Sequence, residues 1–167
     1  MEEMYDKVLD RLRTLCSRRE YSGGDILKKA AGYLSRYGCE PSRVPELASS
    51  VLESLRKDKY VDDLRYALAF ARDKASLSGW GTVKIRHALS AKGIAPSVIS
   101  EALSGIDREQ ADTRLMKILR TKRKALEGDP QSRLKLLRFA LGRGYGYDEV
   151  SNAVRRLEAA DSGTSQE

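Results

Sequence analysis

The chain has 167 residues and a formal net charge of +7, and apolar residues make up 41% of it, enough for a buried core. Only 7% of the residues are aromatic and good helix formers dominate, which argues against a large β-sandwich. No stretch approaches 18 uninterrupted apolar residues and the start lacks a secretory signal, so we expect a cytoplasmic protein with no membrane span.

Apolar residues recur with helical spacing along nearly the whole chain, in three successive passes of three helices. In the first pass, Ser22 and Asp25 resemble a capping box that opens the second helix. In the second pass, Asp62 predicts the N-cap of a helix. In the third pass, Asp129-Pro130 predicts the N-cap and first residue of the middle helix.

Glycines mark the same place in each pass, where the middle helix ends: Gly38, Gly93 and Gly144. Glycine is favoured there because the residue after a helix often adopts a left-handed conformation. The interval of about 50 residues predicts an all-α fold of three tandem three-helix repeats that form an elongated, curved, solenoid-like body. The expected bounds are 1–58, 59–106 and 107–158 for the repeats and 159–167 for a disordered tail.

The sequence shows no group of residues typical of catalysis, a metal site or a cofactor site. His87, the single histidine, has no cysteine or carboxylate cluster beside it, which favours a surface or packing role. Asp62 and Asp63 match a magnesium pair, but adjacent carboxylates before a helix are more often caps. Two roles stay open for Trp80: contact with a partner, or burial in the second repeat. We expect a protein without enzymatic activity, metal or cofactor.

Positive charge is concentrated in the third repeat, where residues 107–160 carry 13 basic and eight acidic side chains. Cations at the end of a helix are favourable in any protein, which explains part of this excess. Two basic helices in succession nevertheless indicate a surface for phosphates or for an acidic protein. The residues expected to dock electrostatically are Lys84, Arg86, Lys92, Arg120, Lys122, Arg123, Lys124, Arg133, Lys135, Arg138 and Arg143.

Four apolar and aromatic residues of the second repeat are expected to hold that repeat together instead of contacting a partner. They are Tyr66, Phe70, Ile85 and Leu89. Because each stands on the apolar side of its predicted helix, replacing any of them should unfold the repeat.

A series of short motifs in the second repeat matches a known family. The motifs are Tyr60-Val61-Asp62-Asp63-Leu64-Arg65-Tyr66-Ala67, Phe70, Arg72, Gly79, Gly81, Lys84-Ile85, Leu89 and Lys92-Gly93-Ile94. With residues 17–22 and 138–145 as counterparts in the other repeats, the sequence resembles the RecX family of bacterial recombinase regulators. Two places depart from the family's pattern. Asp58-Lys59 stands where a glycine-containing turn is usual, and residues 38–46 form a longer link.

The resemblance implies a partner. Proteins of this family bind the RecA recombinase filament on single-stranded DNA and typically inhibit its ATP hydrolysis, strand exchange and coprotease activity, in DNA repair and the SOS response. The basic face would then contact recombinase subunits and DNA phosphates, with the protein acting as a monomer. Two alternatives stay open: a general DNA-binding protein built from helix-turn-helix-like units, and a helical adaptor whose charge serves only solubility.

Overall fold

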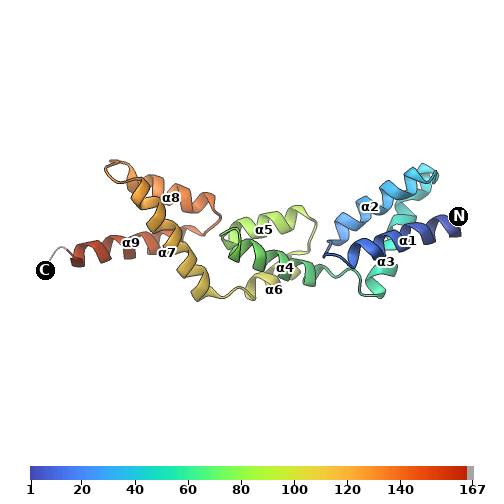
Figure 1. Ribbon diagram of the computed structural model, residues 1–167, viewed down its shortest axis with the longest axis horizontal. Coiled ribbons are helices and arrows are strands. Elements are labelled where there is room, and N and C mark those ends of the chain that lie inside the picture. Colours follow the sequence, from blue (N-terminus) through green and yellow to red (C-terminus); the bar gives the residue numbers. More distant parts are fainter. Residues whose placement is uncertain (165–167) are drawn as a thin grey trace. The chain divides into compact units, whose positions relative to one another are not determined.

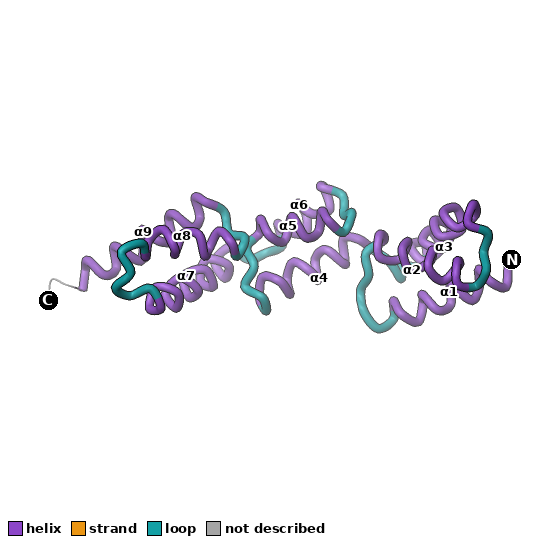
Figure 2. The backbone as a smooth tube through the Cα atoms, turned by 90° about the horizontal axis from the view of Figure 1, so that it is seen from above, coloured by secondary structure: helices purple, strands orange, loops and turns teal. Residues whose placement is uncertain are grey.

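The fold comes from a computed structural model, which describes residues 1–164. Over these residues the chain forms nine α-helices and one short 3₁₀ helix, with no strand (Figures 1 and 2). The helices are α1 (Glu2–Cys16), α2 (Gly23–Arg36), η1 (Pro41–Arg43), α3 (Val44–Lys57), α4 (Asp63–Ser76), α5 (Thr82–Ala91), α6 (Pro96–Ser104), α7 (Arg108–Ala125), α8 (Ser132–Gly142) and α9 (Tyr147–Thr164). The predicted all-α class is confirmed, and none of these described helices is long and apolar enough to cross a membrane.

The chain divides into two compact units, and both contain part of the predicted second repeat. Unit 1 comprises Met1–Phe70 and Leu89–Ala102, whereas unit 2 comprises Ala71–Ala88 and the chain from Leu103 onward. Helices α4 and α5 therefore each contribute residues to both units. The bounds of three separate repeats stay a prediction.

In unit 1, helices α1, α2 and α3 pack pairwise against one another (Figure 1). Each helix contributes fully buried aliphatic side chains to the shared core: Val8 and Leu12 from α1, Ile26 and Leu34 from α2, and Leu55 from α3. In α1 and α2, the spacing of four and eight residues places these side chains on one face of the helix.

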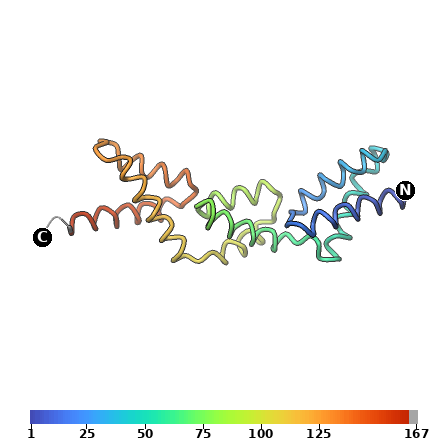
Figure 3. Tube along the Cα trace, in the orientation of Figure 1, coloured from blue at the N-terminus to red at the C-terminus, as the bar shows by residue number. Residues whose placement is uncertain are grey.

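In unit 2, helices α7, α8 and α9 pack pairwise in the same way, and Figure 3 shows their traces in gold, orange and red. Their core contains Leu115 and Leu119 from α7, Leu136 from α8, and Val150 and Val154 from α9. The first and third predicted repeats therefore each enclose a separate hydrophobic core.

The turns that end the middle helices have the predicted backbone conformation. Gly38, Gly93 and Gly144 have φ angles of +83°, +77° and +92°. Lys59, which stands where the family usually has a glycine-containing turn, also has a positive φ, +61°. Side chains with a Cβ atom rarely adopt this region, so Lys59 is a strained position at the end of α3.

Two predicted N-caps are confirmed. Ser22 Oγ accepts a hydrogen bond from Asp25 N (3.1 Å), and Asp62 Oδ1 accepts one from Arg65 N (2.9 Å). Asp63 accepts a hydrogen bond from Gly23 N (2.8 Å), which ties the start of α4 to the start of α2. Both aspartates of the pair thus satisfy backbone amides at helix starts.

Helix α8 differs from its prediction in where it begins, and two of its leucines are exposed. Asp129 Oδ1 accepts from Gln131 N (2.8 Å), so Asp129-Pro130 forms a turn and the helix begins at Ser132. Leu134 and Leu141 recur with helical spacing, yet they are 43% and 38% exposed.

The predicted disordered tail is wrong for residues 159–164, because α9 continues to Thr164. Asp161, on this extension, forms an ion pair with Arg123, which ties the end of α9 to α7. Residues 165–167, the rest of that prediction, lie outside the described residues.

In unit 2, the start of α5 lies against the turn that ends α8. Gly81 N donates to Arg143 O and Val83 N donates to Gly144 O, both at 2.9 Å. A Cβ atom on Gly81 would lie well inside 3.0 Å of Gly144 O and Tyr145 N, so only glycine fits this approach.

Unit 1 contains the corresponding contact, between the start of α2 and the turn that follows α5. A Cβ atom on Gly24 would lie 2.9 Å from Lys92 O. Beside it, Lys92 Nζ donates to both carboxylate oxygens of Asp25, at 3.1 and 3.3 Å. In both units, therefore, the middle helix of one repeat begins against the turn of the repeat that follows it in sequence.

Candidate docking surface

Helix α7 carries a row of exposed cations, which we call the α7 ridge: Lys117, Arg120 and Lys124. Their spacing of three and then four residues places them on one face of the helix. Within the described part of the chain none of these three side chains has an ion pair with a carboxylate. The ridge is therefore a source of positive charge that no carboxylate of the described residues neutralises by an ion pair.

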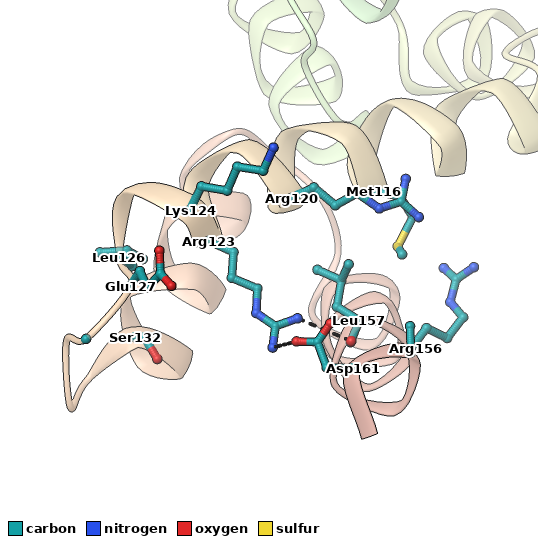
Figure 4. A pocket seen from close by; sticks show the side chains of 12 residues that line it. Met116, Arg120, Arg123, Lys124, Leu126, Glu127, Ser132, Arg156, Leu157 and Asp161 are labelled. Carbon is teal, nitrogen blue, oxygen red and sulfur yellow. Dashed lines mark hydrogen bonds and ion pairs between the residues drawn. The ribbon is translucent and has the colours of Figure 1, made fainter. Parts of the chain in front are cut away.

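A cavity of about 650 Å³ lies on one side of the ridge, between α7 and α9 (Figure 4). Its charged lining residues are Arg120, Arg123, Lys124, Glu127, Arg156 and Asp161. Met116 and Leu157 contribute apolar surface between them. We call this cavity the α7–α9 pocket.

Two of the arginines that line this pocket are held by the protein itself. Arg123 pairs with Asp161 and also donates to Leu157 O (3.2 Å), as Figure 4 shows. Arg156 donates to both carboxylate oxygens of Asp112, and this hydrogen bond lowers the pKa of that carboxyl despite its partial burial. The two ridge cations, Arg120 and Lys124, are left to meet a ligand.

Three further predicted docking residues also have carboxylate partners. Arg133 donates to Glu158 (2.6 Å), and Lys135 donates to Asp129 (2.5 Å), which lowers the pKa of the Asp129 carboxyl. The third, Lys92, binds Asp25. Burial raises the pKa of Asp25, but its hydrogen bonds with Lys92 and Ser22 outweigh this and leave it lowered.

Aromatic rings hold three more of the predicted cations. Lys84 Nζ lies 4.5 Å from the ring centroid of Trp80, and Lys74 Nζ lies 4.6 Å from it. Trp80 is half-buried under these contacts. Lys122 and Arg143 lie over Phe139. The remaining two, Arg86 and Arg138, are exposed and have no ion pair within residues 1–164.

The structure places ten of the eleven predicted docking residues in unit 2 and the eleventh, Lys92, in unit 1. Sequence reasoning missed Lys117 and Arg156. The i, i+3, i+7 spacing with Arg120 and Lys124 is a signal that identifies Lys117. No sequence signal identifies Arg156, because its place in the pocket depends on how α9 packs against α7.

The residues that the sequence offered for catalysis or metal binding are the histidine and the two cysteines. His87 is exposed on α5, as predicted for a surface residue. Among residues 1–164, no group of three or more His, Cys, Asp or Glu side chains is placed to hold a metal ion. Both cysteines are free thiols, and burial raises the pKa of the Cys16 thiol.

The four residues expected to hold the second repeat together are all at least half-buried. Ile85 and Leu89 are fully buried, and the rings of Tyr66 and Phe70 are stacked with centroids 5.9 Å apart. Burial raises the pKa of the Tyr66 hydroxyl. Their positions agree with the predicted packing role.

Taken together, the helices, the glycine turns and the cationic surface define an all-α helical-repeat protein. A family model described as RecX, second three-helix domain, matches residues 62–103. The regulatory protein RecX of Chromohalobacter salexigens is 33% identical over 142 residues, which are 84% of this chain and 86% of the relative. The chain belongs to the RecX family.

Other relatives show the same family with partial coverage. The regulatory protein RecX of Clostridium botulinum (strain Alaska E43) is 35% identical over 114 residues, 66% of this chain. The chain spans about half the length of that relative, 53%. The crystal structure of RecX from Lactobacillus salivarius is 17% identical and superposes with a TM-score of 0.78, over 95% of this chain and 99% of that one, which shows the shared fold.

Proposed function

We propose that the protein regulates the RecA recombinase by binding its filament on single-stranded DNA in the cytoplasm. On this proposal it inhibits ATP hydrolysis, strand exchange and coprotease activity without catalysing a reaction, and it acts as a monomer. Membership of a family whose relatives are named regulatory proteins supports the proposal. The single observation that carries it is the α7 ridge.

The ridge supports a polyanionic partner for a physical reason. A cation that already has a carboxylate partner must give up that contact when it meets a new anion, which cancels part of the gain. Cations without such a partner have only their hydration to lose, and they release counterions from a nucleic acid phosphate. On this reasoning the ridge contributes more to docking, per residue, than Arg133 or Lys135 does.

The decisive experiment compares the filament with bare DNA. The protein is titrated into RecA assembled on single-stranded DNA while ATP hydrolysis is followed, and binding to bare single strands and to duplex is measured in parallel. Inhibition at concentrations well below those that bind bare DNA is the expected result. Tight binding to duplex with no effect on the filament would instead establish a general DNA-binding protein.

A pair of double variants tests the ridge with the same change in charge. Arg120→Ala with Lys124→Ala removes two ridge cations, and Arg133→Ala with Lys135→Ala removes two cations that have carboxylate partners. The affinity for the filament is measured at several salt concentrations. In the ridge variant, the plot of log affinity against log salt should become less steep by about two units, because each phosphate that the protein no longer neutralises reduces the steepness by roughly one. If the second variant lowers the slope as much, the ridge is not the main docking element.

A further inference from the structure

A second cavity of unit 2, of about 330 Å³, lies between α7 and α8 on the other side of the ridge. Its apolar lining comes from Ile118 and Ala125 of α7 and from Phe139 of α8. We call this cavity the α7–α8 groove. Its volume is at the low end for ligand sites, which suits a single anchoring side chain better than a large ligand.

The groove has cations along its edge and, among the residues that the structure describes, no carboxylate in its lining. The cations are Lys117, Lys122 and Arg143, and none of them has an ion pair within the described chain. The Nε atom of Arg143 is buried and has no hydrogen-bond partner among residues 1–164. This differs from the α7–α9 pocket, where Glu127 and Asp161 offset part of the positive charge. The groove is therefore complementary to an occupant that combines negative charge with an apolar group.

The aromatic contacts favour a protein occupant over a nucleic acid. Lys122 Nζ lies 5.0 Å, and Arg143 Cζ 5.9 Å, from the ring centroid of Phe139. Proteins that bind single strands present open aromatic rings on which bases stack. Because two cations already contact the Phe139 ring, the groove offers an aliphatic and aromatic wall for a side chain instead of an open stacking platform.

We propose that the α7–α8 groove binds an acidic peptide segment of a protein partner. One apolar side chain of the segment sits against Ile118 and Phe139, and flanking carboxylates face the three cations. This inference deepens the proposed function and rests on it only in taking the partner to be a protein. Its test uses no recombinase, so the two can fail separately.

The probe is a fluorescently labelled twelve-residue peptide of glutamates with one central phenylalanine, and binding is followed by fluorescence anisotropy. We expect binding that weakens as salt is raised, since salt screens the attraction between the carboxylates and the cations along the groove. A second peptide with serine in place of the phenylalanine should bind at least tenfold more weakly. Equal affinity of the two peptides would mean that no apolar anchor enters the groove and would overturn the proposal.

Two threonines of α7 provide a matched pair of protein variants. Thr121 lines the groove and Thr113 does not; both are exposed, and both donate to the backbone carbonyl four residues earlier, at 3.1 and 2.9 Å. Thr121→Glu should weaken peptide binding at least tenfold because it adds a carboxylate among the cations. Thr113→Glu should leave the affinity within twofold, and equal losses in both variants would refute the site.

Two controls complete the test. Helical content and the thermal midpoint are measured for each variant, and Lys122→Ala replaces Thr121→Glu if the latter does not fold. Oligothymidine is then offered as a competitor. If it displaces the peptide and also loses affinity for Thr121→Glu, the groove is a nucleic acid site and the proposal is wrong. If the parent does not bind the phenylalanine peptide, the groove proposal is rejected, and the proposed function is still tested separately by the filament assay.

Discussion

In unit 2, Gly81 lies so close to the turn at Gly144 that no Cβ atom fits between them, and Gly81→Ala tests this contact. The two backbone hydrogen bonds at this contact, from Gly81 N and Val83 N, are both 2.9 Å long. An added Cβ atom would overlap Gly144 O and Tyr145 N, which are backbone atoms and cannot rotate away. The start of α5 must then separate from the turn.

The expected loss follows from what that separation breaks. Two backbone hydrogen bonds contribute about 1 kcal/mol each to the free energy of unfolding. Tyr145 is 3% exposed, so shifting the turn also uncovers part of a buried aromatic side chain, which costs about 1–2 kcal/mol. We therefore expect Gly81→Ala to lower the free energy of unfolding of unit 2 by about 3 kcal/mol or more.

Trp80, the sole tryptophan, immediately precedes Gly81 and reports on this contact. Urea unfolding followed by its fluorescence gives the free energy for each variant. Gly128→Ala serves as the control for backbone strain alone, since Gly128 has φ +80° and open space around it, and should cost only about 1 kcal/mol. Gly142→Ala, in open space at the end of α8, should stabilise by about 0.5 kcal/mol. A loss below about 1 kcal/mol for Gly81→Ala would refute the reasoning.

Two further predictions concern unit 1. Lys59→Gly relieves a positive φ and should raise the free energy of unfolding by about 0.5–1 kcal/mol. Lys57→Gly, at the last residue of α3, relieves no positive φ and should lower the free energy of unfolding or leave it unchanged. Denaturant titration checks both, and a rise of equal size in the two variants would contradict the strain. The Asp25 carboxyl has a lowered pKa when folded, so its contribution is complete above the ordinary value near 3.9 and is lost as pH falls through the folded pKa. Between about pH 6 and about pH 2, the free energy of unfolding should therefore fall less steeply for Asp25→Asn than for the parent. Asp6→Asn is the control and should follow the parent, because Asp6 is exposed and has no ion pair in the described chain.

Local features of the fold could be predicted because their causes lie within a few residues. The glycine turns follow from the backbone strain that a Cβ atom would suffer, and the caps at Ser22 and Asp62 follow from unsatisfied amides at helix starts. Which side of α8 is buried depends on parts of the chain that are more distant in sequence. Leu134 and Leu141 satisfy a helical period, yet the side of α8 that is buried depends on the directions from which α7 and α9 approach.

One property of the candidate docking surface could also be predicted from the sequence, and others could not. The excess of cations in the third repeat is a property of composition, so the sequence alone indicates that this repeat has a basic surface. Whether a cation is paired was not predictable where its partner is distant in sequence: Glu158 is 25 residues from Arg133. The α7–α9 pocket and the α7–α8 groove likewise form only where helices meet.

By itself, then, the sequence determined the helical class, the position of the turns and the sign of the surface charge. Each of these depends on backbone conformation or on composition over a short stretch of chain. Only the tertiary structure decided that Arg133 is paired with Glu158, and that Gly81 meets Gly144. These depend on distances between residues far apart in the chain, which packing of the hydrophobic cores sets.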